Sequence, residues 1–108
     1  MKAAVIAVML FSGVTNAQVY HCDVEINDQD MYYITAKVDD RGNQFTVTME
    51  NRRDKIRSVT PSPVLDRRES GSMSTEKDNV LYMSMIENGL RGYLIADDKM
   101  KVYLLGCE

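Results

Sequence analysis

The chain has 108 residues, with 13 Lys plus Arg against 16 Asp plus Glu and a net charge of −3. A chain that is acidic overall is not built for non-specific binding to nucleic acids. One histidine and two cysteines exclude most metal centres, because a zinc site needs three or four ligands. We therefore expect no metal ion and no cofactor.

Residues 1–17 predict a secretory signal peptide. Lys2 precedes the apolar run "AAVIAVMLF", and small and polar residues follow it. Such a run is too short to span a bilayer. Thr15 and Ala17 supply the small residues of a cleavage site after Ala17, so residues 18–108 form one mature domain. We expect a secreted monomer that does not insert into a membrane.

The two cysteines, Cys22 and Cys107, lie near the two ends of the predicted mature chain. A secreted chain with two cysteines is expected to pair them. The bond closes nearly the whole domain into one loop, which the loop-entropy relation values at about 4–5 kcal/mol. The sequence therefore predicts a Cys22–Cys107 disulfide.

The first predicted element is the strand "VYHCDVEI", residues 19–26. Its apolar residues Tyr20, Cys22, Val24 and Ile26 alternate with polar ones, which is typical of a half-buried strand. Cys22 is thus expected to point inward. Residues 28–40 are ambiguous, because both strand and helix periodicities fit. Asn27 or Asp28 offers an N-cap and Gly42 a C-terminal cap for the helix.

The remaining elements are predicted as strands separated by turns. "QFTVTME" and the shorter "KIRSV" flank the turn "ENRRD", and residues 60–79 are expected to form a long irregular crossing. Asn88-Gly89 predicts a two-residue hairpin turn. It connects the first two of the last three predicted strands, which are "VLYMSMI", "RGYLIA" and "MKVYLL".

Residues 51–68 carry a local excess of positive charge in an acidic chain. Arginine suits phosphate and carboxylate groups, because its fork donates two parallel hydrogen bonds. No tyrosine is interleaved with these residues. The residues identified as candidate contacts to RNA or to a receptor are Arg52, Arg53, Lys55, Arg57, Arg67 and Arg68.

The sequence predicts no catalytic residues. His21 is the only histidine and neighbours the inward-facing Cys22. Ser74 and Lys77 fit a short Ser-x-x-Lys pattern, but the partner motifs of that pattern are absent. We therefore expect a protein that is not an enzyme.

Several short motifs carry a family resemblance. Tyr20-x-Cys22 follows the predicted cleavage site, and a second cysteine stands at the end of the chain. Between them lie "EINDQDMYYITAKV", "SPVL" and "NVLYMSMIENGLRGYLI". In this layout the chain resembles the small ribonuclease-like secreted effectors of powdery mildew fungi, which are associated with haustoria.

That resemblance implies an α+β, ribonuclease-like fold, in which a single helix packs on an antiparallel β-sheet and a disulfide joins the termini. It places the helix at residues 28–40 and gives Tyr20 and Cys22 roles in folding. Enzymes of that fold need a Glu–His pair and an Arg on the phosphate. No histidine lies in the late strands here, so the resemblance implies a pseudoenzyme.

The expected function is therefore a secreted, non-enzymatic virulence effector that acts in the host plant cell. Its expected partners are host plant proteins, among them an intracellular immune receptor that would make it an avirulence effector. The first alternative is a bacterial periplasmic protein inhibitor, such as a lysozyme inhibitor. The Ser-Gly-x-x-Tyr loop of such inhibitors is incomplete, because no Tyr follows "SGSM" at residues 70–73. The second alternative is weak RNA binding or residual ribonuclease activity.

Overall fold

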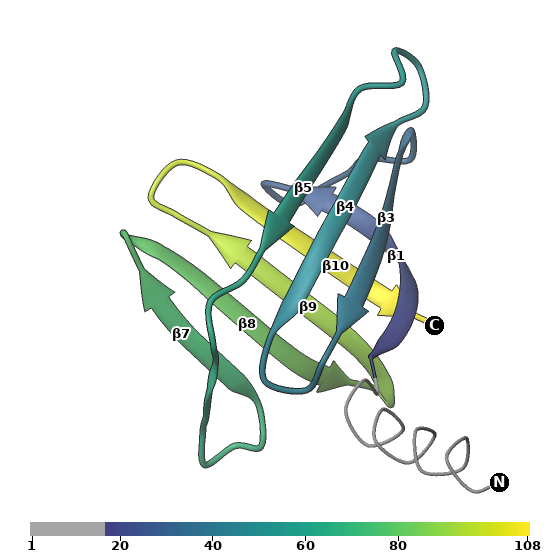
Figure 1. The fold of residues 1–108 in the computed structure, drawn as a ribbon. Helices are drawn as coiled ribbons and strands as arrows, with labels where there is room; N and C mark the ends of the chain where they lie inside the picture. Colours follow the sequence, from purple (N-terminus) through teal and green to yellow (C-terminus); the bar gives the residue numbers. More distant parts are fainter. Residues whose placement is uncertain (1–16) are drawn as a thin grey trace, which may run out of the picture.

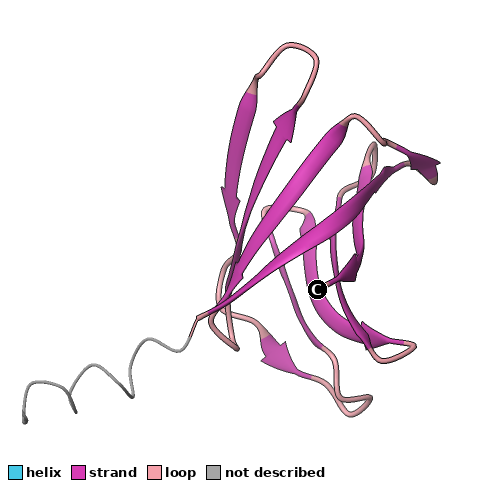
Figure 2. Ribbon diagram, turned by 90° about the vertical axis from the view of Figure 1, so that its right-hand side faces the viewer, coloured by secondary structure: helices cyan, strands magenta, loops and turns pink. Residues whose placement is uncertain are grey.

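The computed structural model describes residues 17–108, so the predicted signal peptide lies outside the described residues apart from Ala17. One continuous antiparallel sheet curls on itself into a half-barrel, and its strand order is β5-β4-β3-β1-β10-β9-β8-β7-β6. Figure 2 shows strands and loops throughout the described chain and no helix. The expected α+β, ribonuclease-like architecture is therefore wrong.

The strands are bounded as follows: β1 Gln18–Ile26, β2 Gln29–Asp30, β3 Ile34–Asp40, β4 Phe45–Asn51, β5 Arg57–Pro61, β6 Asp66–Arg67, β7 Met73–Lys77, β8 Val80–Glu87, β9 Leu90–Ala96 and β10 Lys101–Cys107. In Figure 1, β3, β4 and β5 cross steeply over β8, β9 and β10. The strand β1 belongs to both layers. Its first half pairs with β3 and its second half with β10.

The predicted helix at residues 28–40 is instead made of the short strand β2, a turn and the strand β3. β3 pairs with β1, with Tyr20 opposite Val38 and Cys22 opposite Ala36. Asn27 and Asp28 do not cap a helix, because both adopt positive φ, 52° and 70°, in the turn from β1 to β2. Asn and Asp tolerate this left-handed conformation as readily as they cap helices. The same residue types that predict a helix start therefore form a hairpin turn here.

Most of the other predicted strands are confirmed. The alternation of β1 is as predicted, with Cys22 and Val24 buried. The turn at Asn88-Gly89 has φ values of 52° and 83°, as a type I′ hairpin turn requires. The irregular crossing predicted for residues 60–79 is wrong in part, because β6 and β7 form a further hairpin inside it.

The core lies between the two crossed layers. Phe45 of β4 and Tyr93 of β9 meet at its centre, with ring centroids 4.8 Å apart. Leu65, which is 4 % exposed, covers one side, because the segment after β5 is tied to the start of β4. There the Ser62 amide donates to the Phe45 carbonyl at 2.7 Å.

Candidate functional site

The disulfide fastens the seam between β1 and β10. The predicted bond joins Cys22 and Cys107, whose Cα atoms lie 4.2 Å apart, so this prediction is confirmed. His21 and Glu108 exchange two backbone hydrogen bonds beside it, of 2.9 and 3.1 Å. The cysteines thus face each other as a neighbouring cross-strand pair, where side chains approach closely. His21 itself is exposed on the outer face of the sheet.

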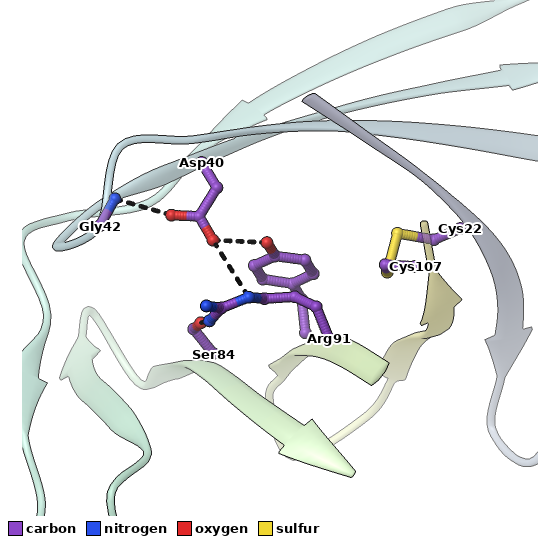
Figure 3. A network of polar contacts seen from close by, with 7 residues as sticks. Cys22, Asp40, Gly42, Ser84, Arg91 and Cys107 are labelled. Atoms are coloured by element: carbon purple, nitrogen blue, oxygen red, sulfur yellow. Dashed lines mark hydrogen bonds and ion pairs between the residues drawn. A yellow bond between two sulfur atoms is a disulfide. The ribbon is translucent and has the colours of Figure 1, made fainter. Parts of the chain in front are cut away.

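A buried polar network lies beside this seam (Figure 3). Asp40, 7 % exposed, accepts a hydrogen bond of 2.5 Å from the Tyr93 hydroxyl and one of 2.7 Å from the Gly42 amide. The Arg91 Nε lies 3.8 Å from the same carboxylate and its guanidinium also donates to Ser84 Oγ. The negative charge of Asp40 is therefore compensated from three sides.

This network resembles an acid–base site in composition but not in access. Burial, followed by the hydrogen bond to Asp40, raises the pKa of Tyr93 far above its ordinary value. A tyrosine that stays protonated cannot act as a base, and its side chain is 0 % exposed. The bond between Asp40 and Tyr93 therefore joins β3 to β9 inside the core.

The six predicted cationic contacts do not form one patch. Arg52, Arg53 and Lys55 lie in the turn between β4 and β5, and Arg57 begins β5. Arg67 and Arg68 lie in and after β6, next to the turn that precedes β7. Figures 1 and 2 both show these two turns at opposite ends of the molecule. The contiguous basic stretch of sequence is thus divided by the length of β5 and the segment after it.

Two tyrosines join the arginines of the β4–β5 turn. The Arg53 guanidinium carbon lies 4.2 Å from the centroid of the Tyr33 ring and 5.7 Å from that of Tyr32. Arg53 also donates to the Tyr32 hydroxyl at 2.9 Å. The Arg52 amide donates to the Tyr33 carbonyl at 2.8 Å, and the Arg52 side chain donates to the Tyr32 carbonyl. We call these four residues the Arg–Tyr tip.

The tyrosines reach the tip because the register of β1 with its neighbours changes between β2 and β3. Between the pairs Glu25–Asp30 and Cys22–Ala36, two residues of β1 lie opposite five residues, 31–35. The extra residues form a turn between β2 and β3, in which the Ile34 amide donates to the Met31 carbonyl at 2.9 Å. Tyr32 lies in this turn and is 67 % exposed.

The tyrosines of the tip lie outside the basic stretch of sequence, so that stretch alone does not identify them. Tyr32-Tyr33 did carry a signal. Two adjacent tyrosines in a strand must point to opposite faces, so one of them is expected to lie on the solvent side.

A cleft of about 640 Å³ lies at the opposite end of the molecule, lined among others by Arg67, Ser70, Ser84 and Arg91. Arg91 already engages Asp40 and Ser84. The incomplete inhibitor loop at residues 70–73 forms part of this cleft. One of the two arginines in the lining of the cleft is thus paired with a carboxylate of the protein itself.

Residues 17–108 contain no cluster of three or more His, Cys, Asp or Glu side chains that could hold a metal ion. In the same part of the chain, no helix is long and apolar enough to cross a membrane. Comparisons of the chain with models of protein families, with curated proteins and with solved structures gave no match.

Proposed function

We propose that the protein is a secreted, non-enzymatic binding protein of the inhibitor type, which engages an acidic site on a partner protein through the Arg–Tyr tip. The observation that carries this proposal is the preformed contact of Arg53 with two tyrosine rings on a projecting turn. Arginine and tyrosine are the residue types most enriched at the energetic centres of protein interfaces.

The tip is organised before any partner arrives. Backbone and side-chain hydrogen bonds connect the β4–β5 turn to the turn between β2 and β3, as the bonds from Arg52 to Tyr32 and Tyr33 illustrate. A side chain that is already held in place loses less conformational entropy on binding. Arg53 has donors left for a partner, because the guanidinium carries five N–H groups and one bond to Tyr32 uses one of them.

The division of the basic residues favours a protein partner over RNA. A nucleic-acid strand is bound along a continuous cationic track that follows its phosphates. Here β6, which contains Arg67, leads into a turn at the other end of the molecule from the tip (Figure 1), and the net charge of the chain is −3. One face of Tyr33 is already covered by Arg53, so it does not offer that face to a base.

The partner class that fits is a glycosidase of the lysozyme type. Such enzymes carry paired carboxylates in a substrate cleft, and arginine binds carboxylates through two parallel hydrogen bonds. The narrow β4–β5 turn, which carries Arg53, has a suitable shape for insertion into a cleft. Because the loop at residues 70–73 lacks the tyrosine of known lysozyme inhibitors, the tip would take over its role.

A host-directed effector is the second candidate. The observation in its favour is that Tyr20 and Cys22 both serve the fold, as the Tyr-x-Cys motif of those effectors suggests. The Tyr20 ring lies 6.5 Å from that of Tyr93, and Cys22 forms the disulfide. The resemblance loses its main support, however, because the helix that it implied is a strand.

The test is an inhibition assay with the secreted protein and a panel of lysozymes of different structural classes and lytic transglycosylases. The readout is the clearing of a peptidoglycan suspension. We expect inhibition of at least one enzyme, and we expect Arg53→Ala to weaken it by about tenfold or more, as for a typical interface anchor.

Arg67→Ala is the matched control, since it removes an exposed arginine at the opposite end of the molecule. It should inhibit as well as the wild type. Lack of inhibition across the panel would reject the inhibitor proposal, and equal losses in both variants would show a general charge effect. If the wild type bound RNA at moderate salt and Arg53→Ala did not, the tip would be an RNA-binding surface instead.

A further inference from the structure

The strand β5 forms an open edge of the sheet. It stands last in the strand order, next to β4 alone. The Asn51 amide donates to the Ile56 carbonyl at 2.9 Å, and the Ser62 amide donates to the Phe45 carbonyl at 2.7 Å. Because these bonds alternate along an antiparallel pair, the backbone groups of Arg57 and Val59 point away from β4.

Pro61 agrees with this assignment. It lies opposite Thr46 in the same register as Arg57 and Val59, and proline is tolerated in a sheet only where no ladder bond needs its amide. The edge is also exposed and partly apolar. Ile56 is 67 % exposed and Val59 is 62 % exposed. Such an edge is a template for a further strand unless it is blunted or covered.

The charge beside this edge is mainly positive. Arg57, Val59 and Pro61 lie opposite Glu50, Thr48 and Thr46, so their side chains share the outer face of the sheet. A groove of about 420 Å³ crosses that face, lined by His21, Thr35, Ala36, Lys37, Thr48, Glu50 and Arg57. Glu50 pairs with Arg57 at 3.5 Å, which leaves Lys37 without an opposite charge within the groove.

We infer that β5 binds an extended, acidic segment of a partner protein as an additional antiparallel strand. The segment places its main-chain groups against Arg57 and Val59, an apolar side chain beside Val59, and an acidic side chain beside the exposed Arg57. This mode of recognition takes its affinity from main-chain hydrogen bonds and its specificity from alternate side chains. The inference rests on the proposed function only in that the partner is a protein, because it uses a different surface from the Arg–Tyr tip.

The experiment is a selection from a phage library of random linear dodecapeptides on the wild-type protein, with counter-selection on Val59→Pro. Proline removes the outward amide at an edge position and leaves the ladder with β4 intact, so this variant should fold. Val59→Ile is the matched control, since it keeps the amide and an apolar, β-branched side chain. Enriched peptides are then synthesised, and their affinities are measured by fluorescence anisotropy.

We expect the enriched peptides to be acidic, with alternating apolar residues. They should bind Val59→Pro about tenfold or more weakly than the wild type, because this variant lacks one main-chain hydrogen-bond donor. Val59→Ile and Arg53→Ala should bind like the wild type, which separates this edge from the tip. Peptides that bind Val59→Pro equally well, a lack of enriched sequences, or a basic consensus would each overturn the inference. A wild-type dimer in light scattering that Val59→Pro dissociates would also overturn it, because a second copy would then occupy the edge.

Discussion

The disulfide seam and the Arg–Tyr tip are both assembled from parts of the chain that are distant in sequence, and they are stabilised in different ways. At the seam, Cys22 and Cys107 are separated by 85 positions and are joined covalently beside the buried Tyr93. At the tip, Arg53 meets Tyr32 across 21 positions through an exposed hydrogen bond. The seam excludes water, whereas the tip projects into it.

This difference separates stability from recognition. Loss of a buried contact leaves a cavity or an unsatisfied polar group, each of which costs about 1–5 kcal/mol. Loss of an exposed contact is compensated by water, so it typically changes stability by less than about 1 kcal/mol. Substitutions at the seam should therefore lower stability, and substitutions at the tip should change binding alone.

The largest expected effect is that of removing the disulfide. Replacing both Cys22 and Cys107 by Ser should lower the free energy of unfolding by about 4–5 kcal/mol, because the closed loop is nearly as long as the domain. Urea unfolding of the wild type and the double variant measures the difference. A loss under about 1 kcal/mol would mean that the hydrogen bonds between β1 and β10 hold the seam without the covalent bond.

The seam was predictable from the sequence, but its setting was not. Two cysteines leave one pairing, and the alternation in β1 places Cys22 inward. The sequence of the partner strand β3 also fits a helix, since Asn27, Asp28 and Gly42 suit helix caps and hairpin turns equally well. The choice between them depends on the pairing of Tyr20 with Val38, a contact between residues 18 positions apart.

The tip was predictable in part, because the sequence identified Arg52 and Arg53 but not the tyrosines that contact them. That contact requires the turn between β2 and β3, and the register of two strands is not encoded in either strand alone. For the same reason, the sequence does not separate Arg67 and Arg68 from the tip arginines, although the turn after β6 lies at the far end of the molecule from the β4–β5 turn (Figure 1).

The second prediction concerns the buried network. Tyr93→Phe should lower the free energy of unfolding by about 1–3 kcal/mol, since it removes a hydrogen bond from the buried Asp40 carboxylate. Phe45→Leu, which changes a ring beside Tyr93 without touching the network, separates packing from hydrogen bonding. If Tyr93→Phe left the free energy of unfolding unchanged, the contacts of Asp40 with Gly42 and Arg91 would suffice to stabilise its carboxylate.

The same tyrosine predicts a pH dependence of stability. The pKa of Tyr93 is raised in the folded state, above the ordinary tyrosine value of 10.0, so the folded protein holds the phenolic proton more tightly than the unfolded chain. The stabilisation is fully present below pH 10 and is lost as the pH rises above it. The midpoint temperature of thermal unfolding should therefore fall more steeply between about pH 8 and pH 11 for the wild type than for Tyr93→Phe. Equal slopes would contradict the assignment.

A smaller effect is expected in the β8–β9 turn, which belongs to the same layer as the seam but is exposed. Gly89 has a φ of 83° and open space around its missing Cβ, so Gly89→Ala is strained by its backbone alone. We expect a cost of about 1 kcal/mol, against about 0.5 kcal/mol or less for Lys99→Ala in the next turn. Urea unfolding checks both. A much larger loss for Gly89→Ala would mean that the turn sets the register of the layer.

The smallest expected effect on stability is at the tip itself. Arg53→Ala removes an exposed cation–π contact and one exposed hydrogen bond, so it should change the free energy of unfolding by less than about 1 kcal/mol. Arg52→Ala is the informative companion, because its amide bond to Tyr33 survives while its side-chain bond to Tyr32 is lost. If either substitution cost more than about 2 kcal/mol, the tip would be part of the folding unit, since exposed contacts do not reach that size. A small cost together with a large loss of inhibition is the combination that separates a recognition surface from a structural one.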